Sequence, residues 1–272
     1  MGILNLSPHS FATMSRASGV AEAIALAKQM EKDGADIIDI GAEPINPVNP
    51  DECTTEKEEC ERLIPTIRAL INEVNVPISV DTSRPQVMDA VVNAGASMIN
   101  DVRALRVPGA LEIVSGLPVP VCLMHMRLLK MPGELEVVEN TTDNNVSLIQ
   151  EIQNFLEERI HACEAAGIAR ERLIIDPGIG TGCFGKSTEE NMEILRSLPQ
   201  FGELGLPLLV GVSRKMFIGD LLNAQVEDRL IGSVVLALAA IQRGANIIRV
   251  HDVLPTVQAI KLMQQTLGVR DW

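Results

Sequence analysis

Polar side chains that could bind a ligand follow short apolar runs in this sequence. Asp176 comes directly after Leu-Ile-Ile at 173–175, a β-branched run typical of a buried strand. A carboxylate at the end of a buried strand is costly unless hydrogen bonds or a cation compensate it. Pro177 and Gly178 then break the strand, and Lys186 precedes a helix capped by Ser187 or Thr188. The segment is either an ordinary strand-to-helix turn or a loop that brings its backbone close to a ligand.

Other apolar runs end in the same way. One such residue is more often structural than functional, but a polar group at the end of almost every strand favours an enzyme or a tight small-molecule binder. The strand-end groups are Asn5, Asp39, Glu43, Asp81, Asn100, Asp101, His125, Asp176, Lys215, Arg249 and His251.

The residue types indicate the ligand. Asp81, Asn100 and Asp176 can form parallel hydrogen bonds with a flat, nitrogen-rich heterocycle. The side formed by Lys215, Arg249 and His251, with Asn5 across from it, suits a phosphate or pyrophosphate, and a cationic clamp stabilises a departing pyrophosphate. Together these residues indicate a heterocycle that carries a phosphorylated leaving group.

Eight strands are expected to hold these groups. In a (β/α)8 TIM barrel, residues after the carboxyl ends of the strands converge on one mouth. The expected strands are 2–6, 36–40, 78–80, 97–99, 121–124, 173–175, 208–210 and 246–250.

Helical patterns alternate strictly with these strands, which predicts parallel strands and right-handed crossovers. We therefore expect an α/β protein, a TIM barrel in a single domain over 1–272; an open doubly wound sheet is the alternative. Glycine is expected to end the helices before GADIID, GASMIN and GANIIR. The expected helices are 20–33, 55–73, 85–94, 108–115, 146–166, 189–204, 227–243 and 253–267.

Composition limits the partners. A net charge of −13 argues against nucleic acid, although a few local cations still allow an anionic small substrate. Five cysteines without a C-x-x-C pair predict reduced thiols and a cytoplasmic protein. No run of about 18 apolar residues and no signal peptide occurs, so we expect neither membrane insertion nor secretion.

Other enzyme classes match less well. No G-x-S-x-G, Walker A or H-E-x-x-H motif occurs. His125 and His251 could join carboxylates in a metallohydrolase barrel, but the first strand lacks an H-x-H pair.

At these residues the sequence resembles the dihydropteroate synthase family along essentially its whole length. Most specific is the ordered pair of VGVSRK at 210–215 and RVHDV at 249–253. Corrinoid-dependent methyltetrahydrofolate methyltransferases resemble the same pterin-binding barrel, but would share only Asp81, Asn100 and Asp176. Further matching segments lie at 1–11, 36–43, 79–85, 99–102, 123–126, 173–186 and 208–219.

The resemblance implies a cytoplasmic transferase of folate biosynthesis, a sulfonamide target, that joins hydroxymethyl-dihydropterin pyrophosphate to p-aminobenzoate. It implies Asp81, Asp176 and Lys215 as catalytic residues. Three groups of binding residues follow from it: Asp81, Asn100, Met124, Asp176, Gly211 and Lys215 for the pterin, Asn5, Arg249 and His251 for pyrophosphate with Mg²⁺ near Asn5, and Pro47, Phe184 and Ser213 for p-aminobenzoate.

The sequence departs from the family pattern in its loops. His9 replaces an Asp, Ile45 and Asn46 replace Thr and Arg, 127–133 is atypical, and Thr181-Gly182-Cys183 form an apparent insertion before Phe184. Two hypotheses follow: a working synthase with an altered p-aminobenzoate site and sulfonamide response, or a pterin-binding paralogue without the condensation.

The resemblance also implies a homodimer through the last helices. From the sequence we expect the apolar residues of those helices to serve mainly in barrel packing. They include Ile231, Val234, Val235 and Leu238.

Overall fold

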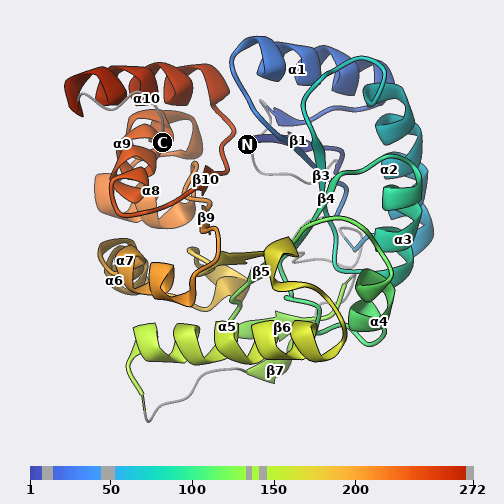
Figure 1. Ribbon diagram of the computed structural model, residues 1–272. Helices are drawn as coiled ribbons and strands as arrows, with labels where there is room; N and C mark the ends of the chain where they lie inside the picture. Colours follow the sequence, from blue (N-terminus) through green and yellow to red (C-terminus); the bar gives the residue numbers. More distant parts are fainter. Residues whose placement is uncertain (8–14, 44–52, 133–136, 141–145, 268–272) are drawn as a thin grey trace.

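Eight short parallel strands lie at the centre of the molecule, with helices around them (Figure 1). The computed structural model describes residues 1–7, 15–43, 53–132, 137–140 and 146–267. All eight expected strands form, and the fold is the expected α/β TIM barrel. The strands are β1 (Gly2–Asn5), β2 (Ile38–Gly41), β3 (Ile78–Asp81), β4 (Met98–Asp101), β5 (Val121–Met124), β8 (Leu173–Asp176), β9 (Leu209–Val210) and β10 (Ile247–Ile248).

The strand order is cyclic. Strands β1, β2, β3, β4, β5 and β8 form one sheet in that order, and β9 pairs with β10. Single parallel bridges join the two sheets, from Ile175 to Leu208 and from Val250 to Gly2. The ladders are short because β9 and β10 have two residues each, yet their order returns to β1, which excludes the open doubly wound sheet.

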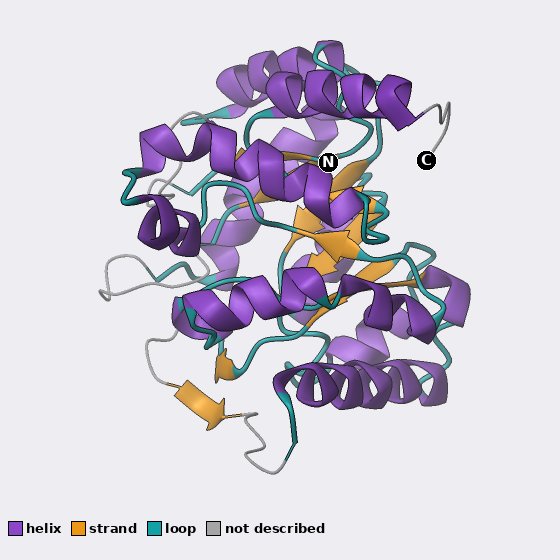
Figure 2. Cartoon of the chain, turned by 90° about the vertical axis from the view of Figure 1, so that its left-hand side faces the viewer, coloured by secondary structure: helices purple, strands orange, loops and turns teal. Residues whose placement is uncertain are grey.

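Helices cover the outside of the strands (Figures 1 and 2). Two boundaries differ from the prediction. The helix expected over 189–204 is interrupted at Ser197, followed by Pro199, and the one expected from 227 begins with a 3₁₀ turn. The helices are α1 (Val20–Lys32), α2 (Glu56–Leu70), α3 (Pro85–Asn93), α4 (Ala110–Ser115), α5 (Leu148–Ala165), α6 (Thr188–Arg196), α7 (Leu198–Phe201), α8 (Met216–Leu222), α9 (Leu230–Ile241) and α10 (Val253–Leu267).

Two features were not expected from the sequence. Helix α8 follows β9, and an antiparallel hairpin of β6 (Leu128–Lys130) and β7 (Val137–Asn140) follows β5. The remaining short elements are the 3₁₀ turns η3 (Arg170–Arg172), η4 (Gly182–Phe184), η5 (Gly202–Leu204) and η6 (Val226–Arg229).

Glycine ends the three helices that precede the GADIID, GASMIN and GANIIR segments, as expected. Gly34, Gly95 and Gly244 have φ of 98°, 117° and 98°. This left-handed conformation costs glycine little, because it has no Cβ.

The core consists of two layers separated by the strands. Ile99, Leu123 and Ile175 belong to the large cluster that also includes helix residues such as Leu63 and Phe201. Their neighbours point to the other face of the ladder and form a smaller cluster inside the barrel, consisting of Met98, Cys122, Ile174 and Leu209. The barrel interior is therefore packed below the mouth.

One prediction about packing is wrong in part. Ile231 and Val235 of α9 are 76% and 56% exposed, so they do not serve in barrel packing, whereas Leu238 packs against the large cluster as expected. Leu221 and Leu222 of α8 and Leu262 of α10 are exposed as well. Among the described residues, no helix has the length and apolar character to cross a membrane.

Candidate active site

Strand register brings the predicted residues to one edge of the barrel. Asn5 pairs with Gly41, Gly41 with Asp81, and Asp81 with Asn100, so one row crosses β1 to β4. Met124 pairs with Asp176 in a second row across β5 and β8. Because side chains two residues apart on a strand share a face, these groups stand directly above the interior cluster.

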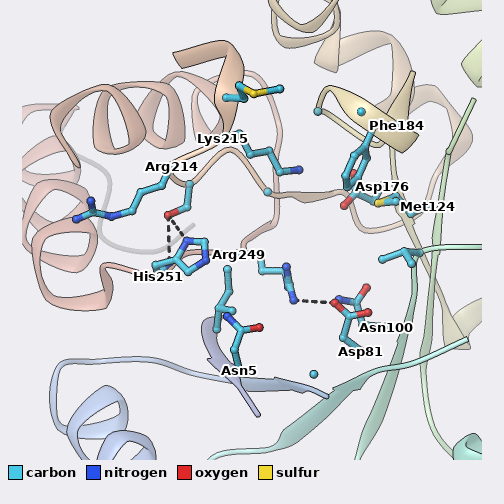
Figure 3. A pocket seen from close by; sticks show the side chains of 18 of the residues that line it. Asn5, Asp81, Asn100, Met124, Asp176, Phe184, Arg214, Lys215, Arg249 and His251 are labelled. Atoms are coloured by element: carbon cyan, nitrogen blue, oxygen red, sulfur yellow. Dashed lines mark hydrogen bonds and ion pairs between the residues drawn. The ribbon is translucent and has the colours of Figure 1, made fainter. Parts of the chain in front are cut away.

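A cavity of about 450 Å³ opens at this edge. Its wall contains every predicted site residue except Pro47, which lies outside the described residues. Figure 3 shows Asp81 and Asn100 beside Arg249, with Asp176, Met124 and Phe184 grouped on another side. The predicted residues in the wall are Asn5, Asp81, Asn100, Met124, Asp176, Phe184, Gly211, Ser213, Lys215, Arg249 and His251.

A buried carboxylate, Asp39, joins the two predicted binding regions. Its Oδ2 accepts Arg249 Nε at 2.6 Å and Asn100 Nδ2 at 3.1 Å. Arg249 Nη2 also donates to Asp81 Oδ2 at 2.9 Å. The predicted pyrophosphate residue Arg249 therefore contacts a predicted pterin residue directly.

Burial changes the proton affinity of these acids. It raises the pKa of Asp81 to about 7, and the Arg249 guanidinium opposes that change. Burial also raises the pKa of Asp176, against the opposing charge of Lys215. Groups whose pKa lies near the working pH are typical of functional sites.

Asp176 is held by the turn that follows it. Its Oδ1 accepts the backbone N–H of Gly178 at 2.7 Å. Gly178 has φ of 71°, and a Cβ there would lie 1.7 Å from the carbonyl oxygen of His125. Glycine is therefore required at this position, where the backbones after β5 and β8 meet.

Lys215 and Phe184 lie next to each other on the cavity wall. The Lys215 ammonium donates to the carbonyl of Ile179 and lies 4.5 Å from the centre of the Phe184 ring. This cation–π contact joins a predicted pterin residue to a predicted p-aminobenzoate residue.

His251 differs from the cationic group expected from the sequence. Burial lowers the pKa of His251 to about 3, and Arg249 acts in the same direction, so the ring is neutral. Its backbone N–H donates to Ser213 Oγ at 3.1 Å, and its Nδ1 lies 3.0 Å from the same oxygen.

His125 is a strand-end group that does not reach the cavity. It is fully buried, packs edge-on against Phe155 at 4.9 Å between ring centres, and lies 3.6 Å from Glu151. Burial lowers the pKa of His125 to about 3. Because His125 and His251 do not meet in the cavity, the metallohydrolase alternative has no support.

Some wall residues were missing from the prediction. Glu43 was counted at a strand end without a role, and it is held there by Arg84 at 3.2 Å. Arg214 has a left-handed backbone with φ of 54° and pairs with Asp252 at 2.7 and 2.8 Å. The S-R-K tripeptide could have indicated Arg214, but only the fold shows that it lines the cavity.

The comparisons with known proteins agree with this geometry. The model of the family described as pterin binding enzyme matches residues 1–251. The chain belongs to the pterin-binding enzyme family. Within that family it belongs to the dihydropteroate synthases, since the dihydropteroate synthase of Escherichia coli K12 is 42% identical over 271 residues, covering 100% of this chain and 92% of the relative.

Solved structures of dihydropteroate synthases have the same fold. The enzyme of Xanthomonas albilineans with 4-aminobenzoic acid is 45% identical, with a TM-score of 0.86 over 99% of this chain and 93% of that one. The Yersinia pestis enzyme in a sulfonamide drug complex is 40% identical, with a TM-score of 0.88 over 98% and 93%. The methyltransferase alternative therefore does not hold.

Proposed function

We propose that this dihydropteroate synthase condenses 6-hydroxymethyl-7,8-dihydropterin pyrophosphate with p-aminobenzoate, releasing dihydropteroate and pyrophosphate. The observation that carries the proposal is the Arg249–Asp81 contact at 2.9 Å. Through this contact Arg249, which would stabilise the leaving pyrophosphate, is hydrogen-bonded directly to Asp81, which would bind the pterin.

The pterin would lie on the strand-end rows. Asp81, Asn100 and Asp176 offer oxygen and nitrogen atoms to the edge of the heterocycle, and Lys215, the residue before α8, offers a donor. Met124 and Gly211 would line the slot for the flat ring.

The pyrophosphate would lie against Arg249, His251 and Asn5. We assign the Ser213 hydroxyl as the donor to His251 Nδ1, which places the hydrogen of the neutral ring on Nε2 for a phosphate oxygen. As the C–O bond breaks, its electron pair leaves with pyrophosphate, and Arg249 stabilises that charge.

The pterin methylene then carries positive charge, which the electron-rich ring and the ionised Asp81 and Asp176 stabilise. The amine of p-aminobenzoate attacks this carbon, forms the C–N bond and loses a proton to solvent. Phe184, Ser213 and Pro47 would hold the arylamine, which needs little help from a general base.

Asn5 fits the expected Mg²⁺. Its Nδ2 donates to Ser15 Oγ at 3.1 Å, which orients the amide oxygen. Among the described residues no cluster of three His, Cys, Asp or Glu could hold a metal ion. Mg²⁺ is often bound by one or two protein oxygens together with substrate phosphates. When bound, it would neutralise charge on the pyrophosphate.

Release of pyrophosphate tests the proposal. Wild-type protein incubated with the pterin pyrophosphate and p-aminobenzoate should release pyrophosphate and form dihydropteroate. Pterin binding by calorimetry without any release would contradict the synthase reaction and favour the non-synthase paralogue.

Three further properties belong to the proposal. A homodimer would cover the exposed Ile231, Val235 and Leu262, and light scattering of Ile231→Asp should then report a monomer. A cytoplasmic location fits the reduced thiols of Cys60, Cys122 and Cys163. A single domain over 1–272 fits the one large cluster shared by strands and helices.

A further inference from the structure

Lys186 is a buried lysine that the proposed reaction does not use, and burial lowers its pKa to about 7. It is 3% exposed and does not line the cavity. Its Nζ donates to the carbonyl of Gly178 at 2.7 Å, of Phe184 at 3.3 Å and of His125 at 3.5 Å. One ammonium thus joins the beginning of the β8–α6 loop, its end, and the backbone after β5.

Arg127 holds the same turn from the outer side. Its backbone N–H donates to Phe184 O at 3.3 Å, and its Nη1 donates to Gly185 O at 3.0 Å. The guanidinium also bonds Glu151 of α5 at 2.8 and 3.1 Å and Glu190 of α6 at 2.9 Å. The turn is therefore fastened to two helices of the barrel.

These bonds determine where the Phe184 ring lies. The ring packs over Gly180, where a Cβ would come within 2.9 Å of it, and it contacts the cluster that contains Met124. The main chain that follows the ring is bonded at Phe184 O by Lys186 and Arg127 and at Gly185 O by Arg127, and the Phe184 N–H before it donates to Thr181 O at 3.3 Å. The main chain that carries the ring cannot shift without breaking some of these bonds, and the ring itself packs against Gly180 and Met124.

We propose that Lys186 is a positioning residue that fixes Phe184 in the p-aminobenzoate subsite without touching either substrate. The inference rests on the proposed function, because it assumes that Phe184 contacts the arylamine. Three hydrogen bonds from one side chain close the loop across its base, and they are strongest in the ammonium form, because charge-assisted hydrogen bonds are stronger than neutral ones. Lys186 thereby determines recognition of the second substrate from outside the cavity.

The variant Lys186→Met tests this role, since it keeps the length of the side chain and removes its donors. The KM for p-aminobenzoate should rise about tenfold or more, because small displacements in a subsite have large kinetic effects. The affinity for the pterin pyrophosphate, measured by calorimetry, should change less than about threefold. Lys57→Met, at an exposed lysine of α2, is the control and should leave both values unchanged.

A double variant separates positioning from a general structural role. Phe184→Ala should itself raise the KM for p-aminobenzoate, and adding Lys186→Met should then have little further effect. If Lys186→Met does not fold, Arg127→Met removes the outer donor and should raise the same KM. A wild-type KM in the folded variants, or full additivity with Phe184→Ala, would overturn the proposal.

Failure of the proposed synthase function can be distinguished from failure of the Lys186 proposal. In that case wild-type protein itself would release no pyrophosphate. The Lys186 proposal would then be tested without turnover, by comparing the affinities of wild-type protein and Lys186→Met for p-aminobenzoate. Both are measured by calorimetry with pyrophosphate present. Equal affinities of wild-type protein and Lys186→Met would overturn it.

Discussion

Two parts of the cavity are held in different ways: the floor, formed by the strand-end residues Asp39, Asp81, Asn100, Asp176 and Arg249, and the rim, formed by the turn at Phe184 and Gly185. On the floor, side chains bond side chains: Asp39 accepts Arg249 and Asn100, and Arg249 reaches Asp81. At the rim, the turn containing Phe184 is held by bonds from Lys186 and Arg127 to main-chain carbonyls. The floor is therefore held by hydrogen bonds among its own side chains. The rim is held by hydrogen bonds that Lys186 and Arg127 donate to its main chain.

The floor also contains buried carboxylates, which carry a cost in free energy. The floor holds the carboxylates of Asp39 and Asp81 on one guanidinium, that of Arg249, and Oδ1 of Asp39 accepts no hydrogen bond from the described residues. Buried polar groups of this kind are costly unless a ligand or a cation compensates them. Arg249 compensates both carboxylates in the ligand-free protein, and Asp81 also lines the cavity.

The largest effect is expected at the floor. Asp176→Asn removes the carboxylate proposed to accept hydrogen bonds from the heterocycle, so pterin binding should fall by about 100-fold or more, because hydrogen bonds to a charged group are strong. Calorimetry with the pterin pyrophosphate measures it, and Asp89→Asn at an exposed position of α3 is the control. Wild-type affinity in Asp176→Asn would show that the pocket assignment is wrong.

Gly178 connects the floor to the rim, and its replacement should reduce stability. Gly178→Ala should lower the free energy of unfolding by roughly 3 kcal/mol or more, because the new Cβ would overlap His125 O. Gly205→Ala is the matched control, since its φ is 68° with no atom near the Cβ, and it should cost about 1–2 kcal/mol. Equal losses in urea unfolding would contradict the close approach.

The smallest expected effect is a dependence of the pterin affinity on pH. Because burial raises the pKa of Asp81 to about 7, this carboxyl takes up a proton below that pH in the folded, ligand-free protein. If the pterin needs the ionised form, affinity should fall about tenfold per pH unit below 7. His251, with a pKa of about 3, does not contribute in this range. The same slope in Asp81→Asn would assign the proton to another group.

The sequence was sufficient for the barrel and most of the floor. Strand–helix alternation predicted all eight strands, and a polar residue at each strand end predicted the row from Asn5 to Asn100. These features depend on neighbouring residues or on the alternation of side chains between the two faces of a strand. Helix α8 was missed because seven residues containing Gly219 give little helical pattern, and Ser197-Leu198-Pro199 interrupted a helix that was expected to be continuous.

Contacts between distant segments could not be predicted. Arg249 and Asp39 are 210 positions apart, and the strand-end pattern predicts that both lie at one edge of the barrel but not that they form a hydrogen bond. Lys186 was recognised only as the end of a loop, and nothing in the sequence shows that its ammonium turns inward toward three carbonyls. The altered residues His9, Ile45 and Asn46 lie outside the described residues, so their predicted roles remain predictions.

The central claim is that the floor binds the pterin independently of the rim. Calorimetric titration of Lys186→Met with the pterin pyrophosphate, in the absence of p-aminobenzoate, tests it most directly. The account predicts an affinity within about threefold of wild type, because the bonds among Asp39, Arg249, Asp81 and Asn100 do not involve Lys186 and Asp176 keeps its bond from the Gly178 N–H. A loss of pterin affinity as large as the rise in KM for p-aminobenzoate would contradict it.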